Sequence, residues 1–277
     1  QANYGTPEYV DYFYKQLNEL LTNYGDVFEI WFDGANGGDG WYGGAKDVRT
    51  IDRKTYYDYP RAYKMIDELQ PQAVIFSDGG PGCRWVGNES GFAGATNWSF
   101  LRAGEVYPGY PKYRELQYGH ADGNQWVAAE CDVSIRPGWF YHPEEDDKVK
   151  TVDQLTDLYY RSVGHNATLF LNFPVDRNGL IHPTDSLNAV SFHQRVQKEL
   201  ADNLLSSAKV VASDERGGKF KVRAATDGQY ETYWATNDGV TSADLTFTFT
   251  QPTKMNRVMI QEYIPLGQRV KSFVVEY

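Results

Sequence analysis

Hydrophobic residues follow two alternating patterns over the first 205 positions, a helical spacing and short runs of consecutive apolar residues. The helical spacing over 7–24 starts after Thr6, a suitable N-cap, and stops at Gly25, a suitable residue after a helix. The apolar run 27–32 follows, as expected of a parallel strand buried on both faces. The two patterns then repeat and predict helices at 56–69, 152–163 and 185–203, and strands at 73–78, 126–132 and 168–173.

Strands that alternate with helices predict an α/β fold with a parallel sheet. Long loops after the strands, such as 79–124, favour a TIM-like (β/α) barrel over an open sheet. A closed barrel needs eight strands in about 250 residues, whereas residues 1–205 supply about four. We therefore expect either an open sheet or about the second half of a barrel whose first strands precede this sequence.

The pattern changes after residue 205, where helical spacing stops and β-branched residues alternate between turns. This region, 206–277, is predicted to be an antiparallel β-sandwich. Its last strand runs into the end of the sequence, so the domain is expected to be incomplete. The predicted strands are 209–212, 219–222, 243–250, 256–261 and 272–277.

The composition of the chain argues against several classes of protein. A net charge of -10 and a pI near 5.0 argue against nucleic-acid binding, which requires a basic face. An aromatic content of 15% fits a carbohydrate-binding protein, because sugar rings stack on aromatic side chains, but it also fits a large core. The two cysteines exclude a disulfide framework. No apolar run approaches the roughly 20 residues of a membrane span.

Acidic residues follow the predicted strands at the end where barrels and doubly wound sheets bind ligands. Asp33 comes directly after the strand 27–32, and Gly34 beside it would let a substrate approach the backbone. A retaining glycosidase needs two carboxyl groups about 5–5.5 Å apart, one as nucleophile and one as acid/base. Asp33 suits the nucleophile, with capping of the following loop as the alternative.

Spacing alone leaves the partner of Asp33 open. Glu130 and its neighbour two positions on would point to the same side of a strand, where they could bind sugar hydroxyls or pair with Arg136. The candidate acids are Glu89, Asp78, Glu130 and Asp132.

No metal site is expected. The acidic run 144–147 is typical of a solvated loop, and its spacing does not match a calcium loop. The five histidines form no H-x-x-x-H pair, and no P-loop, dinucleotide fingerprint or G-x-S-x-G motif occurs.

Four segments in matching order resemble the α-L-fucosidases of glycoside hydrolase family 29. They are E-I-W-F-D-G at 29–34, R-W-V-G-N-E at 84–89, E-C-D-V-S-I-R-P-G-W at 130–139 and L-N-F-P at 171–174. The G-N-E form is similar to the branch that prefers α-1,3/1,4-linked fucose. Residues 1–26 lack the histidines that earlier strands of the family carry, so the sequence resembles the second half of the barrel. Residues 206–277 resemble a discoidin-like, galactose-binding-like domain.

The resemblance implies a retaining mechanism with Asp33 as nucleophile and Glu89 as acid/base. Trp139 matches an aromatic residue that lines the fucose pocket, and Glu130 and Arg136 lie in the same motif. Trp98 is a further candidate for substrate binding, because it is one of several tryptophans near these loops.

The expected partner is therefore a fucosylated oligosaccharide or glycoconjugate, and the expected location is periplasmic or secreted. No cofactor is required; a structural calcium ion in the sandwich is conceivable, but no residue spacing supports it. Three alternatives stay open: a non-catalytic glycan-binding protein, a glycosidase for another sugar, and a segment that is inactive without its upstream strands. The oligomeric state is not specified.

Overall fold

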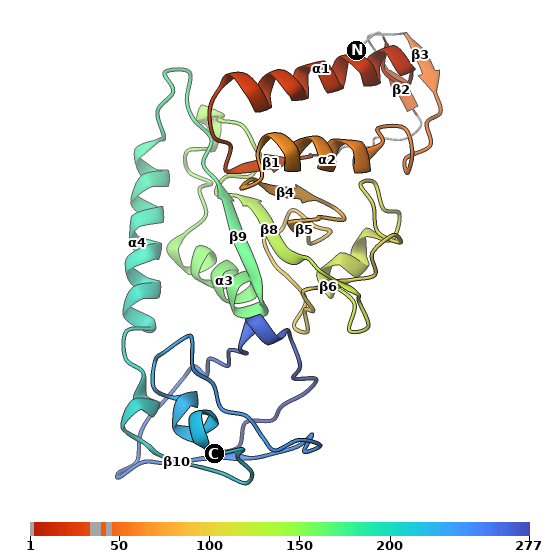
Figure 1. Ribbon diagram of the computed structural model, residues 1–277. Coiled ribbons are helices and arrows are strands. Elements are labelled where there is room, and N and C mark those ends of the chain that lie inside the picture. Colours follow the sequence, from red (N-terminus) through yellow and green to blue (C-terminus); the bar gives the residue numbers. More distant parts are fainter. Residues whose placement is uncertain (1–2, 34–39, 43–45) are drawn as a thin grey trace. The chain divides into compact units, whose positions relative to one another are not determined.

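Five parallel strands form a curled sheet whose order follows the chain in the computed structural model (Figure 1). The structure describes residues 3–33, 40–42 and 46–277. Each strand runs parallel to its neighbours, as in a (β/α) barrel. The strands are β1 (Glu29–Trp31), β4 (Val74–Ser77), β5 (Cys83–Trp85), β8 (Ala128–Ser134) and β9 (Ala167–Asn172).

The two outer strands of this sheet approach each other across its inner face. In a flat sheet β1 and β9 would lie about 19 Å apart, because neighbouring strands are about 4.8 Å apart. Trp31 on β1 instead stacks on Phe170 of β9, with ring centroids 5.7 Å apart, and on Phe76 of β4 at 4.5 Å. The sheet therefore curves like part of a barrel, in agreement with the predicted TIM-like fold.

The strand β5 lies inside the segment 79–124, which the sequence pattern predicts to be a loop. The chain returns from β4 to β5 in close contact with β4. The backbone N–H of Gly82 donates to the Ile75 carbonyl at 3.0 Å, and a Cβ on Gly82 would lie 2.7 Å from the Ile75 nitrogen. Only glycine fits such an approach. A strand of three residues is too short to show a period, which explains why the pattern missed it.

Four helices occupy the predicted positions, and two hydrophobic clusters join them to the outer face of the sheet. The first cluster joins α1 and α2 to β1 and β4, and includes Leu17, Ile66 and Ile75. The second joins α3 to β8 and β9, and includes Leu155 and Val133. The helices are α1 (Pro7–Asn23), α2 (Tyr59–Leu69), α3 (Val152–Ser162) and α4 (Pro183–Glu199).

Two short antiparallel ribbons belong to the loops between the parallel strands. One pairs β2 (Gly40–Tyr42) with β3 (Asp47–Arg49). The other pairs β6 (Phe100–Leu101) with β7 (Gln125–Trp126), so the predicted strand 126–132 divides into the end of this ribbon and β8. No helix among the described residues is long and apolar enough to cross a membrane.

The chain divides into two compact units, residues 1–192 and 193–277. In the second unit β10 (Lys209–Ala212) pairs antiparallel with β11 (Leu245–Thr248), which bears out two of the predicted strands. The described residues at 219–222, 256–261 and 272–277 form no strand, contrary to expectation.

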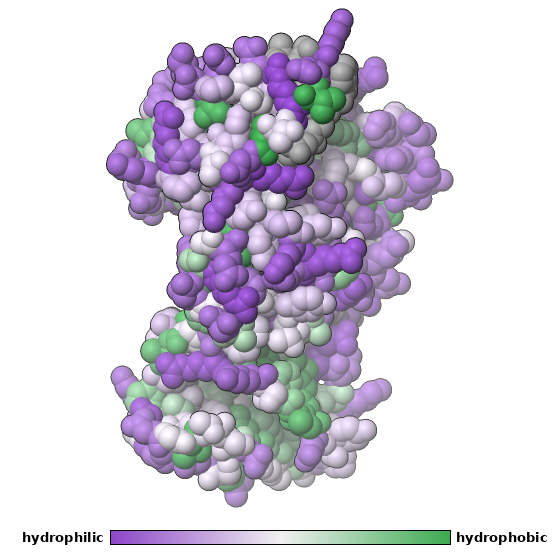
Figure 2. Space-filling view, turned by 90° about the vertical axis from the view of Figure 1, so that its right-hand side faces the viewer, coloured by the Kyte–Doolittle hydropathy of each residue, from purple (hydrophilic) through white to green (hydrophobic). Residues whose placement is uncertain are grey.

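The second unit has little buried surface to hold further strands. Its buried residues are Ala208 and Thr226, whereas Met259 and Val274 are 74% and 83% exposed. Figure 2 shows hydrophobic patches on one face of the molecule. The two-layer sandwich consequently stays a prediction.

Candidate active site

Side chains alternate strictly between the two faces of the sheet, and this alternation builds the candidate site. On β8, Cys131 and Val133 point outward into hydrophobic clusters, so Glu130 and Asp132 point inward. Residues of the other strands follow the same rule. The inward-facing chemical side chains are Glu29 and Trp31 on β1, Cys83 and Trp85 on β5, and Glu130 and Asp132 on β8.

Asp33 and Glu89 come from different strands, and both lie within electrostatic range of one buried carboxyl group. Asp33 follows β1 by two residues and Glu89 follows β5 by four, and both side chains are exposed. Asp132 is 3% exposed, and burial raises its pKa to about 6. The negative charges of Glu89 and Asp33 contribute to this rise in pKa, so both acids lie within electrostatic range of Asp132.

Asp78, another candidate partner, fixes a loop near Asp33. Its Oδ2 accepts a hydrogen bond from the backbone N–H of Gly109 at 2.7 Å. Burial raises the pKa of Asp78, its backbone hydrogen bonds oppose the rise, and the charge of Asp33 adds to it. Asp78 therefore lies on the same rim as Asp33 but is already engaged by the chain.

Trp139 lies against Glu89. Its indole Nε1 donates to Glu89 Oε2 at 3.2 Å, and its backbone carbonyl accepts from Asn172 Nδ2 at 3.1 Å. The residue thus bridges the ends of β9 and the loop after β5. The structure brings together Trp139 and Glu89, two residues singled out from the sequence.

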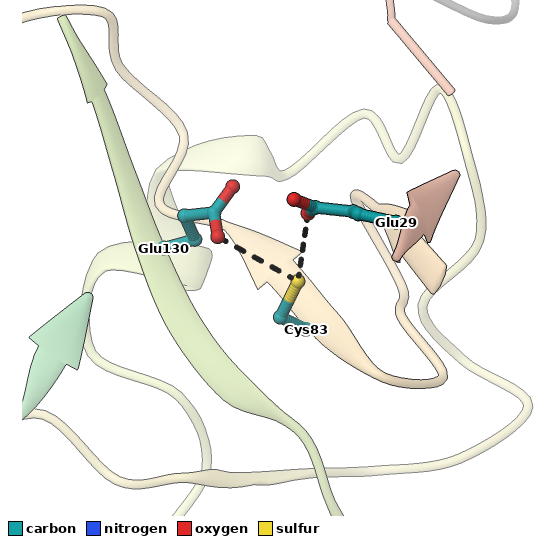
Figure 3. Close-up of side chains that lie close together, drawn as sticks. All are labelled: Glu29, Cys83 and Glu130. Atoms are coloured by element: carbon teal, nitrogen blue, oxygen red, sulfur yellow. Dashed lines mark hydrogen bonds between the residues drawn. The ribbon is translucent and has the colours of Figure 1, made fainter. Parts of the chain in front are cut away.

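Glu130 lies deeper on the inner face, in a group with Cys83 and Glu29 (Figure 3). The Cys83 thiol donates to Glu29 Oε1 at 3.8 Å and is 4.0 Å from Glu130 Oε2. Burial raises the pKa of Glu130 to about 7, and the charge of Glu29 adds to the rise. The nearby Trp31 N–H opposes the rise, although Trp31 Nε1 and Glu130 Oε1 form no hydrogen bond in the structure.

This group contains side-chain types that bind metals, and its candidate ligand atoms lie within 4.8 Å of one another. A tetrahedral zinc ion would bring sulfur and oxygen ligands to about 3.5 Å. The observed separations are longer and fit a thiol that donates to carboxylates. Burial also raises the pKa of Cys83, which disfavours the thiolate that a metal requires. We assign no metal to this group, and the expectation that none is needed stays a prediction.

Arg136 is 1% exposed, and protein carboxylates occupy its guanidinium group. Its Nε and Nη2 donate to the two carboxyl oxygens of Asp185, both at 2.8 Å, and Nη2 lies 2.9 Å from Asp146. The guanidinium also lies over the Tyr141 ring at 4.7 Å. These contacts tie the loop that carries Trp139 to the start of α4. The sugar-binding role of Arg136 remains a prediction.

Trp98 is held on the other side of β5. Its backbone carbonyl accepts from Nη2 of Arg84 at 2.9 Å, and its backbone N–H donates to the backbone carbonyl of Tyr118 at 2.8 Å. Arg84 leaves β5 on the face opposite to Cys83, with its guanidinium fully buried. These contacts place the Trp98 backbone on the outer side, so a role in sugar binding is untested.

Trp85 is one of the aromatic residues that the sequence places near the candidate acids, whereas Trp31 was not selected; both lie on the inner face. Trp85 Nε1 donates to Asp132 Oδ1 at 2.9 Å, and Trp31 has a buried indole nitrogen without a hydrogen-bond partner. Trp31 lies two residues before Asp33, and Trp85 lies two residues after Cys83, so the strand alternation could have placed both on the inner face. Residues that alternate with chemical side chains along a strand share their face.

A barrel-type parallel sheet with acids and tryptophans gathered at its carboxyl rim defines the glycoside hydrolase class. The chain belongs to the alpha-L-fucosidase family, whose family model matches residues 1–194. Residues 209–277 match the F5/8 type C domain.

Several relatives support this membership. The putative alpha-L-fucosidase 1 of Oryza sativa subsp. japonica is 40% identical over 98% of this chain and 50% of that protein. A crystal structure of a glycoside hydrolase 29 family member from an unknown rumen bacterium is 51% identical, with a TM-score of 0.69 over 79% of this chain and 38% of that one. A putative alpha-L-fucosidase from Bacteroides thetaiotaomicron is 41% identical, with a TM-score of 0.76 over 88% and 51%. The chain spans about half the length of the curated relatives it matches.

Proposed function

We propose that this chain acts as a retaining exo-α-L-fucosidase, which removes terminal L-fucose from glycans by double displacement. The observation that carries the proposal is that Asp33 and Glu89, from separate strands, both act electrostatically on Asp132, which indicates that the two acids lie at the same end of the sheet. Membership of the alpha-L-fucosidase family indicates L-fucose as the sugar. Trp139 supports the same reading, since its ring lies beside Glu89 and could pack against a sugar.

In the first step the Asp33 carboxylate attacks the anomeric carbon while Glu89 gives its proton to the leaving oxygen. The glycosidic bond breaks, and a fucosyl ester of Asp33 forms. In the second step Glu89 takes a proton from water, the resulting oxygen attacks the anomeric carbon, and the ester bond to Asp33 breaks. The products are fucose and the shortened glycan, and both side chains return to their starting states.

The proposed substrates are fucosylated oligosaccharides or glycoconjugates with α-1,3/1,4-linked fucose, a preference that rests on the G-N-E form at 87–89. The two steps use side chains alone, so no cofactor is proposed. A periplasmic or secreted location is proposed on the same resemblance.

The decisive experiment separates the two carboxylates by azide rescue. In Asp33→Gly, azide should replace the nucleophile on an aryl α-fucoside and give the inverted fucosyl azide. In Glu89→Ala, azide should intercept the fucosyl ester and give the retained anomer. Asp122→Asn is the control, because Asp122 is exposed and paired with Arg102. The same anomer from both variants, or full activity of Asp33→Gly, would contradict the proposal.

Substrate comparison tests the alternatives. Fucose release from Lewis-type trisaccharides should exceed hydrolysis of aryl galactosides, and the reverse order would indicate a different sugar. Binding of fucose without release from any substrate would indicate a glycan-binding protein. The assay is run on this chain and on the chain extended by upstream sequence, so that an inactive segment is distinguished from a non-catalytic protein.

A further inference from the structure

Asp132 is an acid at the candidate site to which the double-displacement mechanism gives no role. It lies near the end of β8 on the inner face, with 3% of its surface exposed. Its Oδ1 accepts the hydrogen bond from Trp85 Nε1 at 2.9 Å. A buried carboxylate is costly to maintain, so its presence within electrostatic range of two proposed catalytic acids requires an explanation.

Trp85 connects Asp132 to the segment that delivers Glu89. The Trp85 ring stacks on Tyr113, with centroids 6.1 Å apart. Two residues further on, Gly87 has a φ of +75°, and a Cβ there would lie 2.1 Å from the Tyr113 carbonyl oxygen. The start of the loop that carries Glu89 therefore contacts Tyr113 through Trp85 and Gly87, and contacts Asp132 through Trp85.

Charged groups from three elements act on Asp132. Burial raises its pKa to about 6, its hydrogen bonds oppose the rise, and the charges of Glu89 and Asp33 add to it. On its own strand Glu130 also faces inward, and the charge of Asp132 in turn raises the pKa of Glu130.

We propose that Asp132 is a positioning residue of the fucosidase site, which anchors Trp85 and places a third negative charge beside Asp33 and Glu89. The inference rests on the proposed function and assigns that site an additional residue. Hydrolysis of a glycoside passes through an oxocarbenium-like transition state with positive charge on the sugar ring. A negative charge nearby favours this state over the neutral bound sugar, so it contributes to kcat.

The charge depends on pH in a defined direction. Asp132 is protonated below about pH 6 and ionised above it, so its contribution appears as the pH rises through about 6. A unit charge felt across about 10 Å at an effective dielectric constant of about 20 changes a rate by roughly tenfold. We expect an acidic limb near this pH in the rate profile of the wild type.

Two substitutions separate the charge from the anchor. Asp132→Asn keeps an oxygen that can accept from Trp85 but removes the charge. It should lower kcat roughly tenfold at neutral pH with little change in KM, and should abolish the limb near pH 6. Trp85→Phe keeps the charge and removes the N–H that lowers the pKa of Asp132, so it should retain the limb and move it to higher pH. Asp122→Asn, at an exposed position, should match the wild type.

The measurements are pH profiles of kcat and KM for an aryl α-fucoside, with thermal denaturation to confirm folding. An unchanged limb in Asp132→Asn, or equal profiles for both substitutions, overturns the assignment while the proposed function stands. Absence of turnover by the wild type overturns the proposed function and this assignment together.

Discussion

Glu130 provides a stability prediction that does not depend on the substrate. The carboxyl group is 6% exposed, and burial together with the charge of Glu29 raises its pKa from 4.5 to about 7. In the unfolded chain the same group ionises at its ordinary pKa. The substitution Glu130→Gln keeps the size of the side chain and removes its titration.

The sign and size of the effect follow from proton linkage. The folded state holds the Glu130 proton more tightly than the unfolded state, so the free energy of unfolding falls as the pH rises from about 4.5 to about 7. The loss amounts to roughly 3 kcal/mol once both states are ionised. Glu130→Gln has no carboxyl proton to lose. Its free energy of unfolding should therefore fall less than that of the wild type when the pH rises from acidic to alkaline values.

The assay is urea unfolding followed by tryptophan fluorescence at about pH 5 and about pH 8. The difference between these two free energies should be smaller in Glu130→Gln than in the wild type by roughly 2–3 kcal/mol. Comparing differences removes any constant cost of the buried amide. Glu68→Gln is the matched control on α2, because Glu68 is exposed and lies 3.8 Å from Lys64 in a surface ion pair. Parallel pH curves for the wild type and Glu130→Gln would refute the reasoning.

Three further substitutions test the supports of the site. Asp185→Ala leaves the buried Arg136 without its bidentate partner. It should lower the free energy of unfolding, measured with urea, by about 3–5 kcal/mol. A loss of less than about 1 kcal/mol would show that the ion pair contributes little to stability. Gly87→Ala forces a Cβ to 2.1 Å from a main-chain oxygen. It should lower the free energy of unfolding by more than about 2 kcal/mol, which a fall in the thermal midpoint would show. A midpoint equal to that of the wild type would contradict the φ of +75°. Trp139→Phe removes the N–H that Glu89 accepts but keeps a ring, so kcat/KM for an aryl fucoside should fall about threefold to tenfold; unchanged kcat/KM would remove Trp139 from the site.

The fold was readable from the sequence wherever an element was long enough to show its period. The helix at 152–163 is an example, since its spacing predicts α3 within one residue. The strand β5 could not be predicted from the sequence, because a strand of three residues is too short to show a period. The strands expected after 250 failed for another reason: β-branched residues form a strand only where a partner strand pairs with them.

For the site, the sequence identified acids at strand ends but not their surroundings. Asp33 and Glu89 could be selected because their neighbours carry recognisable motifs. The group of Glu29, Cys83 and Glu130 joins three strands, and no spacing along the chain reveals which strands are adjacent. The burial that raises the pKa of Glu130 arises only when the sheet curls.

The order of the strands in the sheet also bears on how the protein folds during synthesis. Among the five strands of this sheet, each one from β4 onward pairs with the sheet strand that comes before it along the chain. Every new strand therefore finds its docking edge already made, and its contacts close loops of moderate length. We expect the sheet to grow from β1 towards β9 as the chain leaves the ribosome, with the Asp33 rim formed before the Glu89 loop is added.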